Sequence, residues 1–398
     1  MTNTDKPIKY IIFAKCECPR QILDAGRLNN YFLKNGLERT RKVRNADVIV
    51  TFTCGGFRYF EERSVHTVKK ILGQKKKSAR FFVTGCLPSI HKEALEMGGD
   101  FTIWPMAQMD RFDELISAKV PYQKVPAPAI LPEVMDLYDQ PLKTLKKRFK
   151  LSPSFISSCI KYSAEKVFNP TKPGQAIFQD AYNLEIARGC LGNCSYCAIK
   201  FAHGKLQSMP EEQVIEEFKQ GLSRGYKRFV IIAGDSGCYG VDIGKTFPGL
   251  LEKLFAVPGD YKIIINDVNA QWIVKYHKEL LSIFKRYQDK IEDVRVPIQS
   301  GSNRILQLMK RPYKIEDVKA NLLDIKKNIP TLKLHTHILV GFPGETTEDF
   351  MESIRLVSDV NFERVDVFCY EDRPNTEASA MQGKIPLTEI RRRAKLIS

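Results

Sequence analysis

Short apolar runs alternate with longer, helix-length segments along most of the chain. Near the N-terminus three runs are short, apolar and rich in β-branched and aromatic side chains, as buried parallel strands are: residues 9–14, 46–52 and 80–85. The segments between them, residues 21–36 and 59–73, have the length of helices and end at a glycine. This order predicts a small open parallel α/β domain over residues 1–120, with its ligand site at the carboxyl ends of the strands.

The second half of the chain repeats a strand and then a helix. Six runs are expected to form parallel strands: residues 182–188, 228–234, 261–266, 293–298, 333–341 and 364–370. Because consecutive βα units with right-handed crossovers curl into a barrel, residues 181–398 are predicted to form a partial (β/α)6 barrel. The fold class is therefore α/β, and the functional residues are expected at the carboxyl ends of the barrel strands.

A region of different composition separates these two domains. Prolines recur through residues 121–180, and a basic segment at residues 143–150 has a helical pattern. We predict a linker here, with one or two helices of its own. The basic segment is either a solvated helix face, which is the more common outcome, or a contact for nucleic acid.

Charge and length limit the class of protein. The chain has 398 residues and a net charge of +16, and residues 1–180 hold 30 of its 62 basic residues but only 18 of its 46 acidic ones. A basic half either attracts nucleic acid or another anion, or keeps the protein soluble. The start of the chain is polar, and no apolar run approaches the roughly 18 residues that span a bilayer. We expect a cytoplasmic protein without a membrane partner.

Ten cysteines in a reducing compartment predict packing thiols or metal ligands rather than disulfides. Cys190, Cys194 and Cys197 follow the first predicted barrel strand within one short loop. Thiolates are the usual ligands of iron–sulfur clusters, and three of them on one cluster leave one iron open to a small molecule. Zinc is the alternative, with His203 nearby, although structural zinc sites use four protein ligands.

The spacing of these cysteines, with Tyr196 before the last one, resembles the signature of radical S-adenosylmethionine (SAM) enzymes. Further segments occur in the order found in the methylthiotransferase family: residues 233–242, 296–302, 309–313, 338–345 and 370–376. Three cysteines near the N-terminus are similar to the pattern of that family's first domain: Cys18, Cys54 and Cys86. The resemblance covers residues 8–395.

The resemblance implies that the three cysteines of the barrel loop hold a [4Fe–4S] cluster. That cluster binds SAM and, with an electron from an external one-electron reductant, cleaves it to a 5′-deoxyadenosyl radical. The residues expected at SAM are Tyr196, Gly234, Asp235, Ser236, Asn266, Asp267, Gln299, Ser300, Arg311, Val340, Gly341 and Phe342.

Several of these residues have a structural alternative. Asn266 and Asp267 are either ribose contacts or helix N-caps. Arg311 and Glu345 are either cofactor contacts or members of structural ion pairs. Gly341, which lacks a Cβ, would let the backbone approach the adenine.

A second [4Fe–4S] cluster is implied for Cys18, Cys54 and Cys86, as the platform for sulfur transfer. One SAM methylates a sulfur on this cluster in the family mechanism, and a second SAM yields the radical that opens a C–H bond. Cys16 is a near neighbour that could replace Cys18. The alternative is that the three thiols only pack as small apolar side chains.

Some positions depart from the family's usual residues. Gln21 and Phe52 stand where Asn is common, residues 207–209 stand where Arg-Ser-Arg is frequent, and His337 stands where Asp is usual. Residues 386–398 resemble the last barrel helix, so we expect the C-terminal TRAM domain, which helps relatives to hold transfer RNA (tRNA) or a ribosomal protein, to be absent.

The sequence therefore predicts a monomeric radical SAM methylthiotransferase acting on a peptide, a protein or a small metabolite. Residues 197–205 and the surroundings of Asp242 resemble the subgroup that modifies a protein aspartate. A tRNA methylthiotransferase is the first alternative, favoured by the basic N-terminal half. Two further alternatives remain. One is another sulfur or methyl transfer on the same fold, and the other is a non-enzymatic iron–sulfur or zinc module that binds nucleic acid.

Overall fold

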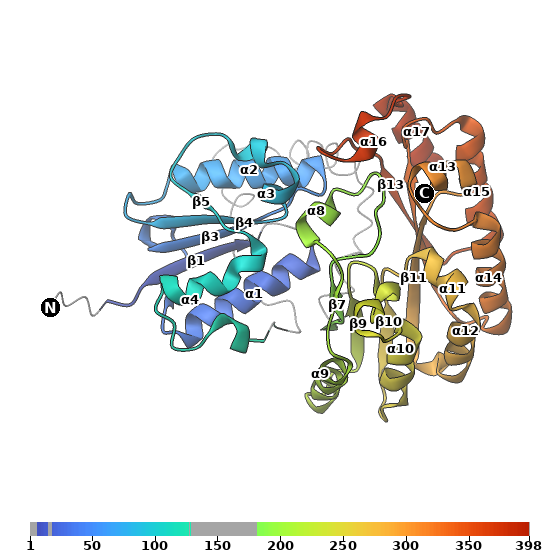
Figure 1. Ribbon diagram of the computed structural model, residues 1–398, viewed down its shortest axis with the longest axis horizontal. Coiled ribbons are helices and arrows are strands. Elements are labelled where there is room, and N and C mark those ends of the chain that lie inside the picture. Colours follow the sequence, from blue (N-terminus) through green and yellow to red (C-terminus); the bar gives the residue numbers. More distant parts are fainter. Residues whose placement is uncertain (1–5, 15–17, 127, 129–180, 398) are drawn as a thin grey trace, which may run out of the picture. The chain divides into compact units, whose positions relative to one another are not determined.

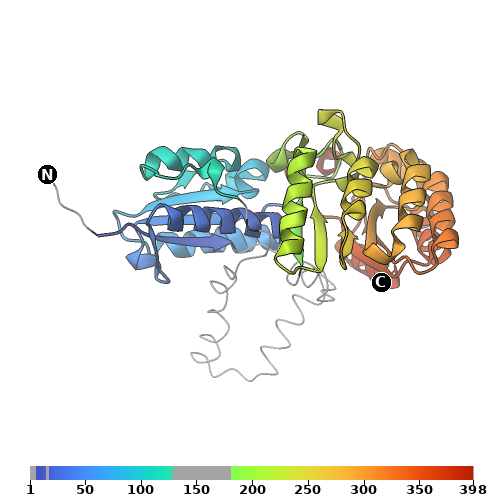
Figure 2. The same cartoon turned by 90° about the horizontal axis from the view of Figure 1, so that it is seen from below.

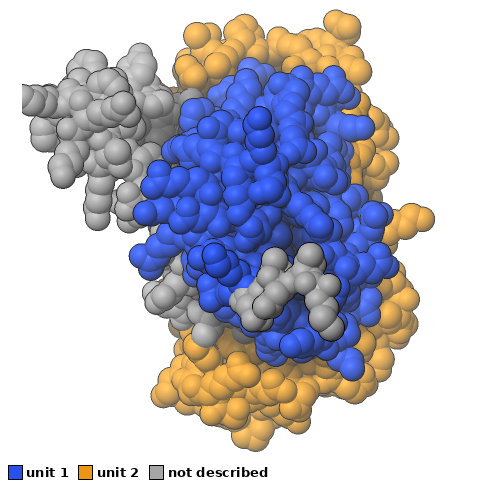
Figure 3. All heavy atoms as spheres, turned by 90° about the vertical axis from the view of Figure 1, so that its left-hand side faces the viewer, with its two compact units in different colours: residues 1–152 blue, residues 153–398 orange. Residues whose placement is uncertain are grey.

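The structure is a computed structural model that describes residues 6–14, 18–126, 128 and 181–397. The chain divides into two compact units, Met1–Ser152 and Pro153–Ser398, which are called unit 1 and unit 2 (Figure 3). The boundary between them falls within the predicted linker. Most of that linker, including the basic segment at residues 143–150, lies outside the described residues.

Unit 1 is built on a five-stranded sheet in the order β2-β1-β3-β4-β5, in which all neighbours pair in parallel. Its strands are β1 (Lys9–Ala14), β2 (Glu38–Arg39), β3 (Val48–Thr53), β4 (Arg80–Gly85) and β5 (Thr102–Ile103). The three strands predicted from the sequence are the long central ones. The two short strands lie at the edges.

Helices cover both faces of this sheet, as Figure 1 shows. They are α1 (Pro19–Lys34), α2 (Arg58–Leu72), α3 (Leu87–Ile90) and α4 (Phe112–Leu115). Alternate side chains of a strand point to opposite faces: Tyr10 and Ile12 pack with residues of α1 and α4, whereas Ile11 packs with residues of α2 and α3. Unit 1 is thus a three-layer α/β/α domain.

Unit 2 is a partial barrel of six parallel strands in the order β13-β12-β11-β10-β9-β6. The strands are β6 (Tyr182–Glu185), β9 (Arg228–Ile232), β10 (Lys262–Ile265), β11 (Ile291–Gln299), β12 (Leu334–Val340) and β13 (Arg364–Cys369). The predicted α/β class and the partial (β/α)6 barrel are confirmed. The first strand is shorter than expected, because the chain leaves the barrel after Glu185.

The longer helices of unit 2 lie outside the curved sheet (Figure 2). The longer ones are α9 (Glu211–Ser223), α10 (Phe247–Ala256), α12 (His277–Arg286), α14 (Ile315–Asn328), α15 (Thr347–Val360) and α17 (Leu387–Ile397). The shorter ones are α8 (Ile199–His203), α11 (Ala270–Lys275), α13 (Asn303–Leu308) and α16 (Glu377–Ala380). Within the described ranges, none of the helices has the length and apolar character needed to cross a membrane.

An aromatic cluster fills the core on one face of the sheet of unit 1. The ring of Phe112 is fully buried, and its centroid lies 4.8 Å from that of Trp104, 5.3 Å from that of Phe82 and 5.5 Å from that of Phe32. We expect Phe112→Ala to lower the free energy of unfolding by about 3–5 kcal/mol, because it leaves a cavity among these rings.

The measurement is urea denaturation of the full chain. Leu33→Ala on α1 is the matched control, because Leu33 is 51% exposed and its truncation is expected to change stability by no more than about 0.5 kcal/mol. Equal unfolding midpoints for the two variants would contradict this account of the core.

Candidate functional site

The loop that carries Cys190, Cys194 and Cys197, here called the unit 2 thiols, is closed at its base by a two-stranded antiparallel ribbon. The ribbon pairs β7 (Ala187–Arg188) with β8 (Gln207–Ser208). Gly189, directly after β7, has φ +72°, and a Cβ there would lie 2.0 Å from the carbonyl oxygen of Lys205. Only glycine fits this closing position. The ribbon itself was not predicted from the sequence.

The sulfurs of the loop lie close together and receive polar contacts. The amide of Gly192 donates a hydrogen bond to Sγ of Cys190 at 3.1 Å. A hydrogen bond with the buried thiol of Cys238 lowers the pKa of Cys190. Burial, and then the neighbouring Cys194 sulfur, raise the pKa of Cys197. Cys238 thus lies at this site, although it has no counterpart in the cysteine motif.

The thiol loop is anchored on the end of α13 and on the residues that follow it. The hydroxyl of Ser195 donates to the carbonyl of Leu308 at 2.7 Å, and its amide donates to the carbonyl of Met309. Arg311 donates to the phenol oxygen of Tyr196 at 2.7 Å, and the Tyr196 ring meets the buried ring of Phe342 edge-on at 6.4 Å. Three predicted site residues, Tyr196, Arg311 and Phe342, are therefore in contact.

The loops after β9 and β10 are joined to one another. Ser236 donates from its amide to the carbonyl of Asp267 at 2.9 Å and from its hydroxyl to the carbonyl of Asn266 at 2.5 Å. The side-chain amide of Asn266 donates to the carboxylate of Asp267. Asn269, not Asn266 or Asp267, is the N-cap of α11. The N-cap alternative for these two residues is therefore wrong, and both remain available at the strand end.

Asp235 is held from three sides. Its carboxylate accepts hydrogen bonds from the indole of Trp272 at 2.9 Å and from the amides of Gly237 and Asn269 at 3.1 Å. Burial raises the pKa of Asp235 to about 6, although these donors oppose the shift. The carboxylate thus connects the loop after β9 to the start of α11. The role of Trp272 was missed, since a lone tryptophan on a helix carries no sequence signal for such a contact.

Gln299, at the end of β11, has an uncommon backbone conformation and a side chain without a hydrogen bond in the described residues. Gln299 has a left-handed backbone with φ +80°, which is uncommon for a residue other than glycine and often marks a functional site. Within the described residues, its side chain makes no hydrogen bond, and it lies beside Ser300. The Ser300 hydroxyl instead accepts from the amide of Ser302 at 3.1 Å. Of these two predicted SAM contacts, Gln299 has the freer polar group.

The loop after β12 is supported from outside the barrel. Val340 packs with residues of α15 and α17, and a Cβ on Gly341 would lie 2.4 Å from Ile390 of α17, so helix packing accounts for this glycine. Glu345 accepts from the amide of Gly341 at 2.8 Å and pairs with the buried Arg393 at 2.6 Å. The ion-pair alternative for Glu345 is confirmed.

A second set of thiols, Cys18, Cys54 and Cys86, is gathered in unit 1 and is here called the unit 1 thiols. Cys54 and Cys86 follow the adjacent strands β3 and β4 directly, and Cys18 is the N-cap of α1. A Cβ on Gly85 would lie 2.3 Å from the carbonyl oxygen of Thr53, so the residue before Cys86 must be glycine. Cys16 and Cys159 lie outside the described residues.

The unit 1 thiols lie close enough for charge on one sulfur to shift the pKa of another. Burial raises the pKa of Cys86 above its usual range, and the sulfurs of Cys18 and Cys54 raise it further. Burial also raises the pKa of Cys18, while the backbone amides of Gln21 and Arg20 lower it. The side chain of Gln21 donates to Sγ of Cys86 at 2.9 Å. Cys18 and Cys86 are therefore poorly ionised unless a cation balances their charge.

Both thiol sets fit an iron–sulfur cluster better than a single ion. Within the described ranges, no group of three or more His, Cys, Asp or Glu side chains has the geometry to hold one metal ion. The three thiolates of a four-iron cluster bind different irons, so they lie farther apart than ligands that share one ion. The donor chemistry, thiols with amide donors at their sulfurs, is the kind that iron–sulfur sites use.

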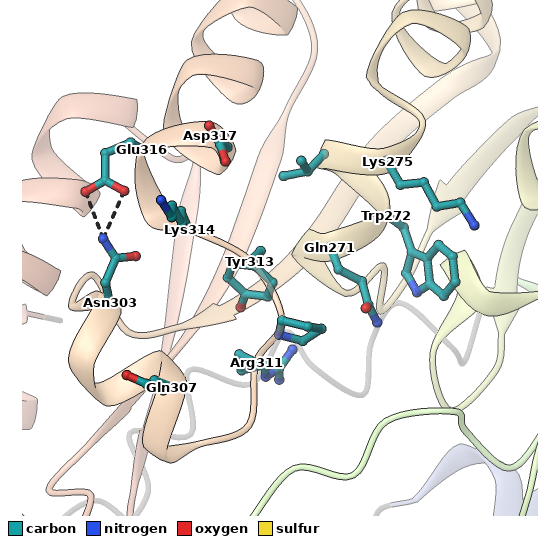
Figure 4. Close-up of a pocket in the computed structure, with 12 residues that line it drawn as sticks. Gln271, Trp272, Lys275, Asn303, Gln307, Arg311, Tyr313, Lys314, Glu316 and Asp317 are labelled. Atoms are coloured by element: carbon teal, nitrogen blue, oxygen red, sulfur yellow. Dashed lines mark hydrogen bonds between the residues drawn. The ribbon is translucent and has the colours of Figure 1, made fainter.

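A groove of about 1110 Å³ opens between α11, α13 and α14 of unit 2 (Figure 4). Its polar lining includes Trp272, Lys275, Asn303, Arg311 and Tyr313, and Figure 4 shows Asn303 bonded to both oxygens of Glu316. The thiols are not part of its lining. Arg311 is the one predicted site residue that the groove shares.

The basic runs of unit 1 lie away from its thiols. Arg39, Arg41 and Arg44 are exposed; Arg39 ends β2, and the other two lie between β2 and the amino end of β3. Residues 75–77 precede β4, where Lys75 pairs with Asp100 and Lys76 with Asp47. The thiols are at the carboxyl ends of the same strands, and six residues of strand span about 20 Å.

Two family descriptions match the chain, one in each unit. Residues 184–357 match the Radical SAM superfamily, and residues 11–102 match Uncharacterized protein family UPF0004. These matches contain all six cysteines of the two thiol sets. One match covers most of the parallel sheet of unit 1, and the other covers most of the parallel sheet of unit 2.

Similar curated proteins carry methylthiotransferase names. A probable threonylcarbamoyladenosine tRNA methylthiotransferase of Pyrococcus horikoshii is 27% identical over 381 residues, which are 96% of this chain and 81% of the relative. The ribosomal protein uS12 methylthiotransferase RimO of Protochlamydia amoebophila is 29% identical over 384 residues, 94% of this chain and 72% of the relative. Similarity thus extends over both units.

Solved structures with the same fold are radical SAM enzymes. The radical SAM methyltransferase TsrM of Kitasatospora setae, solved with cobalamin and a [4Fe–4S] cluster, has a TM-score of 0.62 at 12% identity and covers 94% of this chain and 77% of its own. The cobalamin-dependent enzyme OxsB has a TM-score of 0.57 at 12% identity, over 88% of this chain and 52% of its own. At this identity the likeness concerns the fold.

Two glycines at the base of the thiol loop allow a matched test of its closure. Gly189 and Gly204 have similar positive φ angles of +72° and +70°, but no atom lies within 4 Å of a Cβ built on Gly204. Alanine at either position costs about 1–3 kcal/mol of backbone strain, and only Gly189→Ala adds a clash with backbone. We expect Gly189→Ala to be the less stable variant in thermal unfolding and to retain less iron after reconstitution. Equal values for the two variants would contradict the closure described.

Proposed function

Because the chain belongs to the radical SAM methylthiotransferase family, we propose that it replaces a hydrogen of an unactivated C–H bond by a methylthio group, using SAM and two [4Fe–4S] clusters. The observation that carries the proposal is common to both units: three thiols are brought together in segments that follow strands of a parallel sheet. Three protein thiolates leave one of four irons without a protein ligand, which is what SAM or a transferable sulfur requires.

The unit 2 thiols hold the cluster that meets SAM, and the unit 1 thiols hold the auxiliary cluster. When bound, these groups supply the electron that cleaves SAM and the sulfur that is transferred. The chain's own contribution is to fix the thiolates. The Gly192 amide donates to Cys190, and Gln21 donates to Cys86. An external one-electron reductant completes the reaction.

Arg311 is suited to hold the carboxylate of SAM. Its guanidinium is buried and donates to Tyr196 at 2.7 Å and to the carbonyl of Pro297 at 3.4 Å. Its Nε is buried without a partner in the described part of the chain, which leaves a donor for an incoming acceptor. A carboxylate is the acceptor that a guanidinium binds best.

The other expected SAM contacts lie at successive strand ends. Gln299 has an uncommitted side-chain amide, and Asp267 shares its left-handed backbone conformation, with φ +53°. Asn266 presents its amide beside Asp267, and the buried Phe342 ring packs against Tyr196 and Tyr370. Asp235 and Ser236 join the loop after β9 to the segment after β10 through backbone contacts. We therefore assign these two residues to positioning.

We propose a peptide, a protein or a small metabolite as the acceptor of the methylthio group. The thiol edge of unit 1 is separated from the exposed basic runs by the length of the strands, so those runs are not groups of the reaction site. Transfer RNA is the second candidate, favoured by the net charge of +16 and by the names of several relatives. A long polyanion could touch the basic edge and the thiol edge together.

Two triple variants test the division of labour between the thiol sets. Wild-type protein, reconstituted without oxygen, should bind about eight irons, and each triple alanine variant about four. Without the unit 2 thiols, formation of 5′-deoxyadenosine from SAM and dithionite should be abolished. Without the unit 1 thiols, it should continue while the methylthio product disappears.

The cysteine in β13 serves as the control for both variants. Cys369→Ala removes a partly buried thiol outside both sets and should leave the iron content and both activities unchanged. Continued SAM cleavage without the unit 2 thiols, or methylthio product without the unit 1 thiols, would refute the assignment of the clusters.

The acceptor class is tested by salt-dependent binding of tRNA. If a peptide or a metabolite is the substrate, tRNA should bind weakly and without preference for sequence, with affinity that falls steeply as salt rises. The basic-run variant Arg39→Ala/Arg41→Ala/Arg44→Ala should then lose affinity equally for every RNA. A tight complex with one tRNA, followed by its methylthiolation, would make tRNA the substrate.

A further inference from the structure

Gln21 lies at the unit 1 thiols although its residue type is unusual for a packing position. It occupies the first turn of α1, three residues after Cys18, and its side chain is fully buried. Its Nε2 donates two hydrogen bonds, to Sγ of Cys86 at 2.9 Å and to the carbonyl of Thr53 at 3.2 Å. The helix that begins at one thiol therefore sends a side chain to another.

The orientation of this amide is fixed by its surroundings. The carbonyl oxygen of Thr53 also accepts from the amide of Cys86 at 2.8 Å, so it is an acceptor for both neighbours. Turning the Gln21 amide over would set its own oxygen against that carbonyl oxygen, which is unfavourable. The N–H groups must therefore face Thr53 and Cys86, and the Cys86 sulfur always receives a donor.

Stability alone does not account for a glutamine here. Its Oε1 is buried and has no hydrogen-bond partner in the part of the chain that the structure describes. Leaving a buried polar atom unsatisfied costs about 1–3 kcal/mol, so an apolar side chain of the same size would suit a purely packing role better. The cost points to a function for the donor end of the amide.

The three thiols differ in how their charge can be stabilised. Cys18 and Cys54 are partly exposed, and backbone amides of the first turn of α1 act on Cys18. Cys86 is the buried one, with 4% exposure, so water is largely excluded from its sulfur. The Gln21 amide supplies a hydrogen bond to this sulfur, which water reaches least.

We infer that Gln21 is a positioning residue for the auxiliary cluster, which fixes the Cys86 thiolate through an N–H···S hydrogen bond and raises the reduction potential of that cluster. A donor to a ligand sulfur withdraws electron density and so favours the reduced state. The inference rests on the proposed function, because it takes Cys86 as a cluster ligand. Gln21 itself makes no contact with the reacting atoms.

The test isolates the auxiliary cluster in the full chain by removing the unit 2 thiols, as in the triple variant above. In this background Gln21→Met keeps the length of the side chain and removes its N–H groups. The midpoint potential, followed by electron paramagnetic resonance (EPR), should become more negative. One exchangeable hydrogen that is coupled to the reduced cluster in electron–nuclear double resonance (ENDOR) should be lost.

Thr84→Val is the matched control in the same background. Thr84 is fully buried at the end of β4, and its hydroxyl has no partner among the described residues. The replacement should leave the potential and the exchangeable-hydrogen coupling unchanged. A shift as large as that of Gln21→Met would mean that any buried substitution near Cys86 moves the potential, and would overturn the inference.

A measurement without substitution at position 21 guards against a variant that does not fold. Background protein labelled with ¹⁵N only in glutamine side chains should show a ¹⁵N coupling to the reduced cluster. Absence of that coupling, or an unchanged potential in Gln21→Met, overturns the role of Gln21. A folded background protein that binds no cluster at all contradicts the proposed function instead, so the two failures are distinct.

Discussion

A close approach of two backbones precedes one cysteine in each thiol set, and the geometry of both sites depends on it. At Gly85 the chain passes so near the Thr53 carbonyl that a Cβ would come within 2.3 Å, and at Gly189 it passes the Lys205 carbonyl at 2.0 Å. The first approach brings Cys86 beside Cys54, and the second closes the loop that begins at Cys190. Hydrophobic burial holds the sheets together, but these contacts determine where the sulfurs lie.

Much of the fold could be predicted from the sequence, because parallel strands buried on both faces form short apolar runs that stand out from their surroundings. The strands at residues 9–14 and 80–85 have the predicted bounds, and the six barrel strands are in place. The ribbon that closes the thiol loop was missed. Two strands of two residues are too short to leave a hydrophobic period.

The thiol sets could be proposed from the sequence because the strands end at their cysteines. Their supporting contacts could not, since these join residues that are distant along the chain. Asp235 is bound by Trp272, and Glu345 is paired with Arg393, 48 residues later. Glycine motifs were also ambiguous: at Gly341 the space for a Cβ is taken by Ile390 of α17. Sequence patterns reveal which residue types are present at a strand end, but not which partner each one faces.

The buried pair of Arg393 and Glu345 joins α17 to the loop after β12. Since Glu345 also accepts from the Gly341 amide, the docking of this helix and the shape of the strand end are linked equilibria. A molecule that binds the loop in its present form therefore stabilises the docked position of α17. The docked helix strengthens the binding of that molecule by the same free energy. The amide protons of a helix on the outside of the barrel would therefore report, by slower exchange with solvent, on the occupancy of its mouth.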